Sequence, residues 1–248
     1  MQTLNKSLYP LIFARKSTRS FLHEPVGPKA LAGLQQFLTT LAPLFEGQPF
    51  RCAVVPGKNG EYRLCGCTNG SAQGNANLGF MLQQADLYLQ SQGFGAVWYG
   101  MGRAPKEEKA NFAPLSYTIC LRFGVPNGPA LRTAESQFNR LPLSRLTANP
   151  GPLAEVLNAA RLAPSAANGQ PWRFVVQPGL LHFYRRKPGA LAQKLLGSFS
   201  FVDMGIAACH AALALQHAGA AVTVALLPGA PPAPAGAEYS FSLQTTGL

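Results

Sequence analysis

The sequence predicts an α+β fold in which one chain carries two similar halves, and two repeated segments support this prediction. Residues 27–55 contain a helical stretch, a Gly-Gln-Pro-aromatic-Arg turn and a β-branched run, and residues 151–176 contain the same succession. Residues 79–93 and 205–219 both begin and end with glycine, with alanine, leucine and glutamine at matching positions between. We therefore expect each half to run helix, strand, helix, strand.

Local signals predict the individual elements. A first helical stretch covers residues 8–14, and Pro28 and Pro152 stand just inside the next two helix starts, where the fixed φ of proline is tolerated. The two repeated glycine-bounded segments are expected to be buried helices, each closed by its C-terminal glycine. Strands are expected in the runs that end at residues 55 and 176, and at 96–99, 117–123, 180–184, 222–227 and 239–243, the last as an edge strand.

The boundary between the halves is expected near residues 146–151, where Thr-Ala-Asn-Pro-Gly is typical of a linker. The first half is then residues 1–146 and the second is residues 147–248. A duplicated chain is the covalent counterpart of a symmetric homodimer, so we expect a monomeric pseudo-dimer, and the sequence leaves its further association open.

Composition excludes several classes of protein. The chain has 248 residues, of which 47% are hydrophobic, so it can bury a sizeable core. Its longest apolar stretches fall short of the roughly 20 residues that span a bilayer. The apolar run near the N-terminus precedes basic residues, the reverse of a signal peptide, and a cytoplasmic location is expected. Five cysteines without disulfide spacing indicate reduced thiols, and the pair Cys65 and Cys67 lacks the second ligand pair of a zinc site.

The net charge of +11 raises the question of an anionic partner. Of the 21 Lys and Arg residues, fifteen lie in residues 1–146 and six follow. They form no run or stripe, so we expect a basic solvated surface and no nucleic-acid partner. A few of them are candidates for binding a phosphate.

Residues 15–21 (RKSTRSF) place two arginines around a hydroxyl at the end of the first helical stretch. In extended chain the side chains of Arg15, Ser17 and Arg19 leave on one face and can converge on a single anion. The planar fork of arginine suits a phosphate. The alternative is a basic helix end that complements its own dipole.

Residues 163–172 (APSAANGQPW) form a second signature, between a helix and a strand of the second half. Serine, asparagine and glycine there gather donors that can hydrogen-bond a flat heterocycle rich in carbonyls and ring nitrogens. The alternative is an ordinary turn, with Asn168 and Gly169 in left-handed geometry and Trp172 in the core.

Together the two signatures resemble the FMN-dependent nitroreductase family, in the branch whose single chain carries two fused halves that imitate the homodimer. Residues 77–100, 123–126 and 138–142 are similar to the family's central helix with its following strand, its G-x-P turn and its basic phosphate contact. The resemblance implies bound FMN and a nitroreductase-like three-layer α-β-α sandwich, internally duplicated.

Each half departs from the family in a complementary way. The first half has the arginine motif, but residues 43–47 (PLFEG) stand where PSAANG is expected. The second half keeps residues 164–168 but has no counterpart of residues 15–19. The two retained half-sites compose one complete site.

The resemblance implies the following cofactor contacts. The phosphate and ribityl tail would meet Arg15, Lys16, Ser17, Arg19 and Arg140, with Arg132 and Arg145 as further candidates. The ring would meet Pro164, Ser165, Ala166, Asn168 and Gln170. Backbone N–H groups around Gly100 and Met101 would face flavin N5, although Gly100 replaces an acidic residue common in the family. Candidate cleft walls are Trp98, Tyr99 and Phe21, and the alternative for each of them is packing in the core.

A bound FMN carries the redox chemistry itself, so no catalytic side chain and no metal ligand is expected. The implied activity is ping-pong reduction of nitroaromatic or quinone-like acceptors by NAD(P)H. A flavin-binding or sensing protein without efficient turnover is one alternative, and a basic nucleic-acid-binding module without flavin is another. His210, His217, Asp86 and Asp203 are expected to be ordinary helix, capping or interface residues.

Overall fold

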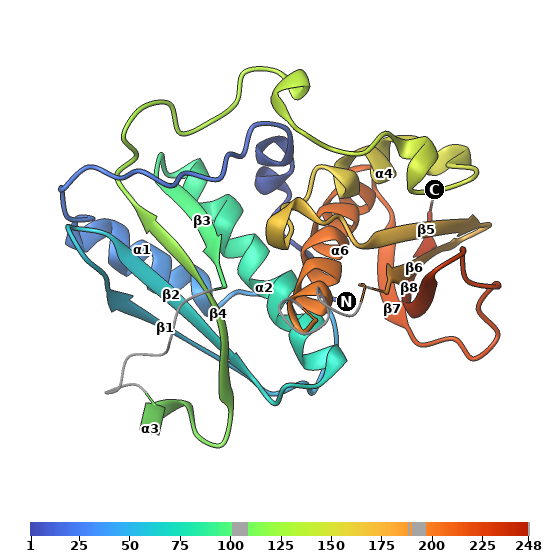
Figure 1. Ribbon diagram of the computed structural model, residues 1–248, viewed down its shortest axis with the longest axis horizontal. Helices are drawn as coiled ribbons and strands as arrows, with labels where there is room; N and C mark the ends of the chain where they lie inside the picture. The colour runs from blue at the N-terminus through green and yellow to red at the C-terminus, as the bar shows by residue number, and fades with distance from the viewer. Residues whose placement is uncertain (101–108, 188, 190–196, 248) are drawn as a thin grey trace.

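The structure is a computed structural model that describes residues 1–100, 109–187, 189 and 197–247. Two antiparallel sheets of four strands stand at opposite ends of the molecule, with helices α2 and α6 side by side between them (Figure 1). The first sheet contacts α2 and the second contacts α6, so the layers run sheet, helices, sheet. The α+β class is confirmed, with the helices forming the middle layer.

The element bounds are as follows. The α-helices are α1 (Pro28–Leu38), α2 (Ala72–Ser91), α3 (Lys109–Phe112), α4 (Ala154–Arg161) and α6 (Phe199–His217). The 3₁₀ helices are η1 (Lys6–Phe13), η2 (Glu135–Gln137), η3 (Leu143–Arg145), η4 (Gly151–Leu153) and η5 (Ala166–Asn168). The strands are β1 (Phe50–Pro56), β2 (Tyr62–Thr68), β3 (Gly95–Tyr99), β4 (Ser116–Gly124), β5 (Trp172–Gln177), β6 (Leu180–Arg186), β7 (Ala221–Ala225) and β8 (Ala237–Thr246).

The two sheets have the same construction. Their strand orders are β1-β2-β4-β3 and β5-β6-β8-β7, so each inner pair joins a second and a fourth strand in chain order. Each inner pair also has one register shift, after Gly66 on β2 and after Phe183 on β6. Gly66 pairs with the third residue of β1, and Phe183 pairs with the third residue of β5. The likeness therefore extends from the topology to a local irregularity.

Three sequence expectations need correction. The strand at 239–243 is not an edge strand, because β8 pairs with β6 on one side and β7 on the other. Alternation of buried and exposed side chains shows that a strand has two faces, and it does not show how many neighbours the strand has. Strand β2 was not predicted, since it has few β-branched residues. The first helical stretch is a 3₁₀ helix that contains Pro10, whose missing N–H interrupts α-helical bonding.

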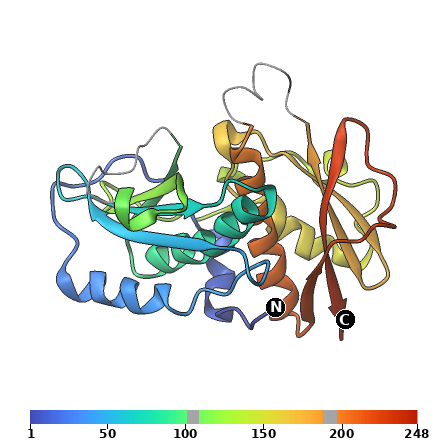
Figure 2. The same cartoon turned by 90° about the horizontal axis from the view of Figure 1, so that it is seen from below.

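The two central helices cross at a pair of glycines. A Cβ on Gly79 would lie 2.0 Å from the carbonyl oxygen of Val202, and a Cβ on Gly205 would lie 1.8 Å from that of Ala76. Since backbone atoms cannot give way as side chains do, both positions require glycine. The view in Figure 2 shows the two helices crossing at the centre of the molecule. The paired glycines noted in the sequence therefore mark a close backbone contact between the helices.

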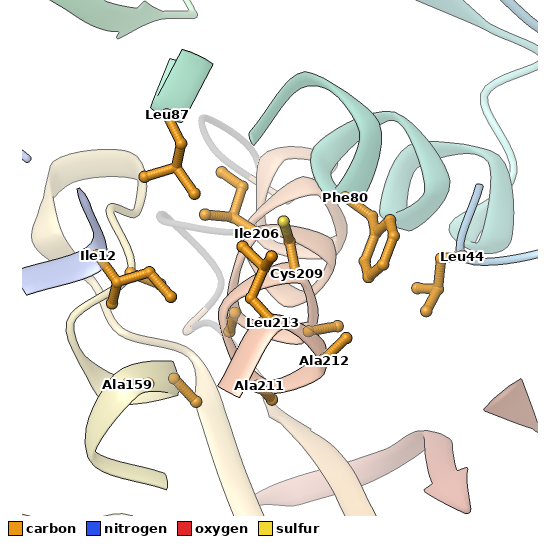
Figure 3. Close-up of a cluster of buried hydrophobic side chains, with 14 of the residues drawn as sticks. Ile12, Leu44, Phe80, Leu87, Ala159, Ile206, Cys209, Ala211, Ala212 and Leu213 are labelled. Carbon is orange, nitrogen blue, oxygen red and sulfur yellow. The ribbon is translucent and has the colours of Figure 1, made fainter. Parts of the chain in front are cut away.

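The core surrounds this crossing. Phe80 from α2 and Ile206, Cys209 and Leu213 from α6 meet Ile12 from η1 in one apolar cluster (Figure 3). Helix α6 is apolar and long enough to cross a membrane by length and composition alone, but 89% of that stretch is buried inside the fold. A helix that is apolar on all sides and enclosed by protein is typical of a core helix.

Candidate active site

A cavity of about 640 Å³ lies between residues of the first sheet and the start of α6. Four segments line it: the chain after η1, the ends of β3 and β4, the connection between β4 and α4, and the loop 164–168 with the first turns of α6. Its lining residues are Lys16, Ser17, Arg19, Val97, Trp98, Gly100, Ile119, Arg132, Gln137, Asn139, Arg140, Pro164, Ser165, Ala166, Ala167, Asn168, Phe199, Asp203 and Ile206.

Most of the residues expected at the cofactor site line this one cavity. They are Lys16, Ser17, Arg19, Gly100, Arg140, Pro164, Ser165, Ala166 and Asn168. Trp98 and Arg132 also line it, whereas Tyr99, Phe21 and Arg145 do not. Met101 lies outside the described residues. Side chains more than 140 positions apart in the sequence thus share a single cavity.

The arginine segment is fixed along the edge of the first sheet. Ser17 forms a parallel bridge with Ala96, and the Thr18 N–H donates to the Ala96 carbonyl at 2.9 Å. Thr18 is buried, while Ser17 and the exposed Arg19 face the cavity. The alternation expected from extended chain therefore brings Ser17 and Arg19 to the same wall.

Arg15 does not line the cavity. Its side chain is buried, and its Nε lies 3.0 Å from Oδ2 of Asp86 on α2. Its Nη2 donates to Ser17 Oγ at 3.2 Å. A charge-neutralised Arg15 inside the fold can orient Ser17, and direct contact with a ligand would require it to leave this position.

A buried polar network joins Trp98 and the arginine segment to α2. Asp86 accepts hydrogen bonds from Gln83 at 3.1 Å and from Gln90 at 2.8 Å. Gln83 Oε1 accepts from Trp98 Nε1 at 3.1 Å, and Gln90 Oε1 accepts from the Lys16 N–H at 2.8 Å. Because every bond ends on the same helix, Trp98 and the arginine segment are positioned by one rigid element.

His210 belongs to this network as a neutral side chain. Its Nδ1 donates to the carbonyl of Ala159 at 3.0 Å, which leaves Nε2 to accept from Gln83 at 3.1 Å. Burial lowers the pKa of His210 to about 3, with Arg15 and Arg140 acting in the same direction. The sequence expectation of an ordinary helix histidine agrees with this arrangement.

The connection between β4 and α4 is bound to the loop of the second half. Arg140 donates to the Ala163 carbonyl at 3.0 Å and to Asn168 Oδ1 at 2.9 Å. Gln170 is buried outside the cavity lining, and its Oε1 accepts from the Leu141 N–H at 2.7 Å. Arg140 thus lines the cavity and also binds the β4–α4 connection to the loop of the second half. Gln170 supports the same contact from outside the cavity.

Cations are crowded on this side of the cavity. Burial, together with repulsion from Arg15, Arg132 and Arg161, lowers the pKa of Arg140 to about 10. Burial and Arg15 lower the pKa of Arg132 in the same way. The Arg132 and Arg140 guanidinium groups lie 4.2 Å and 5.8 Å from the centre of the Phe138 ring. The two guanidinium groups repel each other, and an anion bound between them would offset this repulsion.

The loop of the second half is held in a rare backbone conformation. Ala167, Asn168 and Gln170 have φ values of 49°, 55° and 46°. Left-handed geometry costs a residue other than glycine roughly 1–2 kcal/mol. Ser165 supports the loop, since its Oγ accepts from the Gln170 N–H at 3.0 Å and its carbonyl accepts from the Asn168 N–H at 3.0 Å. Strain of this kind concentrates at binding and catalytic sites.

Asp203 is a site residue that sequence reasoning missed. Its Oδ1 accepts from the Ala166 N–H at 3.0 Å, and burial raises its pKa to about 8. The internal repeat could have revealed it. At the matching position in the first half, Asn77 Oδ1 accepts from the Leu44 N–H at 2.7 Å. The first half therefore has an asparagine amide, Asn77, at the position where the second half has a carboxyl group, Asp203.

The equivalent position in the first half is nearly closed. Phe45, Gln73, Ala76 and Tyr239 are among the residues around a space of only about 170 Å³. The Phe45 ring meets the edge of Phe241, with 5.7 Å between ring centres. The two halves therefore differ in what fills equivalent positions.

The comparisons with known proteins agree with this architecture. The family described as "Putative TM nitroreductase" matches residues 7–215. The chain belongs to this nitroreductase family. Among curated proteins, no sequence matches it.

Solved structures resemble this nitroreductase-family chain to different extents. A "putative nitroreductase" from Thermotoga maritima is 19% identical, with a TM-score of 0.70 over 98% of this chain and 95% of that one. This likeness confirms the nitroreductase-like fold. A nitroreductase with bound FMN from Desulfitobacterium hafniense is 13% identical, with a TM-score of 0.43 over 56% of this chain and 100% of that one.

Proposed function

We propose that the chain binds one FMN in this cavity and uses it as an NAD(P)H-dependent oxidoreductase. The acceptors would be small electron-poor molecules such as nitroaromatics or quinones. In this proposal the halves are residues 1–146 and 147–248, and each supplies one side of the site. The observation that carries it is the meeting of residues 16–19 with residues 164–168 around one cationic cavity.

The size and charge of the cavity fit FMN. Its volume of about 640 Å³ falls within the roughly 300–1,000 Å³ typical of cofactor sites. Lys16, Arg19, Arg132 and Arg140 would hold the phosphate. A phosphate dianion placed among them would offset the repulsion that lowers the pKa of Arg140.

The remaining lining fits a flat ring. Trp98 and Phe199 offer aromatic surface, and a Cβ on Gly100 would lie 3.0 Å from the Phe199 ring. Glycine at position 100 therefore keeps space open beside the Phe199 ring. Ser165 and Asn168 would supply the polar contacts to the ring that distinguish a heterocycle from a plain aromatic.

FMN would supply the hydride chemistry, and the chain's own residues would supply binding and protons. The strained loop and the α2 network would hold the site open in one geometry before the ligand arrives. At neutral pH Asp203, with its raised pKa, holds a proton, which sits on Oδ2 because Oδ1 accepts from Ala166. That proton is available to an acceptor that gains negative charge during reduction.

The visible absorption spectrum of the purified protein, with identification of any flavin released by heat, tests the proposal. Arg19→Ala should weaken FMN binding roughly tenfold, since a charge-assisted contact is worth about 1.5–3 kcal/mol. Arg145→Ala is the matched control, because Arg145 is also exposed and lies outside the cavity. A colourless protein that does not bind added FMN would contradict the proposal. Bound FMN without NAD(P)H oxidation would instead support the flavin-sensing alternative.

A further inference from the structure

A second group of reactive side chains lies on the outer face of the first sheet. Alternate residues of β2 and β4 point away from the helices, and Cys65, Cys67 and Cys120 form a small cluster there with Val55 and Phe112. This cluster is separate from the main core. Ile119, one residue before Cys120, lines the flavin cavity, so the cluster and the cavity lie on opposite faces of β4.

Cys65 and Cys120 are direct partners across two strands. They face each other in the register of β2 and β4, and both are fully buried. Side chains directly opposite in an antiparallel pair have Cβ atoms about 4.5–5.5 Å apart. A disulfide has a Cβ separation of about 3.5–4.5 Å, so only a small shift separates this pair from bond formation.

Two buried donors beside this pair have no acceptor among the residues that the structure describes. They are Nε of Arg63 on β2 and the hydroxyl of Tyr117 on β4. A buried donor left without an acceptor costs roughly 1–3 kcal/mol. A thiolate at Cys120 would give these groups a negatively charged acceptor. The arrangement therefore favours the ionised form of one sulfur.

The charges around the pair also favour the ionised form of Cys120. Interaction with the Cys65 thiol, with Tyr117, Arg63 and Arg122 acting in the same direction, lowers the pKa of Cys120 to about 7 against the effect of burial. The same interaction and burial raise the pKa of Cys65. Within the described part of the chain, the other groups near Cys120 are neutral or already paired. The Tyr99 carbonyl on β3 accepts from Cys120 Sγ at 3.7 Å, and Glu61 pairs with Arg122 at 2.5 Å.

The other cysteines lack this environment. Burial raises the pKa of Cys67 to about 11, with Cys52 adding to the shift. Cys209 in α6 is buried among apolar side chains, and its pKa is raised as well. Cys120 and Cys65 are thus the one pair, among the described cysteines, that combines a nucleophile with a neighbouring thiol able to react with it.

We propose that Cys120 and Cys65 form a redox-active dithiol that hydroperoxides oxidise to a cross-strand disulfide. The Cys120 thiolate attacks the terminal oxygen of the hydroperoxide and the O–O bond breaks. A sulfenic acid forms, and after proton uptake the leaving oxygen departs as an alcohol, or as water when the oxidant is hydrogen peroxide. Cys65 then attacks the sulfenic sulfur. The S–S bond forms as the S–O bond breaks, and the hydroxyl group leaves as water with the Cys65 proton. Two electrons pass from the two thiols to one peroxide.

The cover over the pair is small enough to open locally. Phe112 of the four-residue helix α3 packs against the cysteines, and Leu115 adds to it. Exposed Arg51 holds this segment by donating to the carbonyls of Asn111 and Ala113 at 2.6 Å and 2.9 Å. Exposed hydrogen bonds of this kind open more readily than those of the sheet beneath.

Alkylation with iodoacetamide across a range of pH tests the thiolate, with each cysteine followed separately by peptide mass spectrometry. The rate at Cys120 should rise about tenfold between pH 6 and pH 8 and then level off, as a group of pKa near 7 requires. Cys67 in the same sample is the internal control and should keep rising above pH 9. Tyr117→Phe should shift the Cys120 midpoint to higher pH. A Cys120 profile that parallels Cys67 would overturn the proposal.

Hydrogen peroxide at one equivalent tests the disulfide in the folded full chain. The expected product is a Cys65–Cys120 disulfide that dithiothreitol reverses. Cys65→Ser should leave a sulfenic acid on Cys120 that dimedone traps, and Cys209→Ser should change nothing. No disulfide in the folded chain, with normal thiol reactivity after denaturation, would also overturn the proposal. None of these readouts depends on bound flavin.

Discussion

Arg15 Nε lies 3.0 Å from Asp86 Oδ2, and the two side chains are 1% and 0% exposed. This ion pair joins the segment after η1 to α2 at the centre of the fold. It also explains why the first arginine of the RKSTRSF motif does not reach the cavity, since its charge is already neutralised inside the protein.

Asp86→Asn should therefore lower the free energy of unfolding by about 3–5 kcal/mol, because it leaves the Arg15 charge buried and uncompensated. Urea denaturation measures this. The matched control is Glu135→Gln, which breaks the Arg161 pair at a carboxylate that is 42% exposed and should cost about 0–1 kcal/mol. An equal loss of unfolding free energy in the two variants would show that the burial of the ion pair does not determine how much it stabilises the fold.

Asp203 should make stability depend on pH. Its folded-state pKa of about 8 lies above the ordinary value of 3.8, so the folded state binds more protons than the unfolded state between these values. The free energy of unfolding should then fall as pH rises from about 4 to 8, by at most about 1.4 kcal/mol per pH unit for one proton. Asp203→Asn keeps the Oδ1 acceptor for Ala166 and should remove this slope. Urea denaturation of both proteins at several pH values, at equal flavin content, gives the difference, and parallel curves would contradict the assignment.

The glycine crossing should be intolerant of any side chain. Gly205→Ala would bring a methyl group to within 1.8 Å of the Ala76 carbonyl oxygen, so the helices must separate. We expect a loss of at least about 3 kcal/mol, measured by thermal or urea unfolding. Gly229→Ala is the control, because a Cβ there meets nothing within 4 Å. A stable Gly205→Ala variant would mean that α2 and α6 pack less closely than described.

The chain should bind one FMN, not two. Phe45 and its neighbours leave only about 170 Å³ at the equivalent position in the first half, too little for a flavin. The ratio of flavin absorbance to protein concentration, checked by isothermal titration, measures the stoichiometry. A ratio near two would show that this second position opens.

The elements most accessible from the sequence were those with periodic or repeated signals. The glycine-bounded helices and the strand at 96–99 were predicted because the same sequence pattern occurs once in each half. Strand β2 was missed because its Leu-Cys-Gly-Cys core is not β-branched, and its tendency to form a strand comes from its neighbours on both sides.

The candidate site was predictable in outline for the same reason. Two motifs in different halves pointed to one cavity, and most of their residues line it. The repeat aligns Asp203 with Asn77, but the raised pKa of Asp203 could not be predicted, because it depends on enclosure by elements distant in the chain. Arg15 could not be separated from Arg19 either, since only the fold reveals that Asp86 lies beside one of them.

The position of β4 and β8 has a consequence for how this chain is made. In each sheet the strand that is synthesised last is an inner strand. Strands β2 and β3 emerge from the ribosome before β4, which pairs with both, and β6 and β7 emerge before β8, which pairs with both. Until β4 or β8 emerges, each sheet exposes open hydrogen-bonding edges to other nascent chains. The chain is therefore most vulnerable to aggregation during two brief periods of its translation, and each period ends when one strand is inserted.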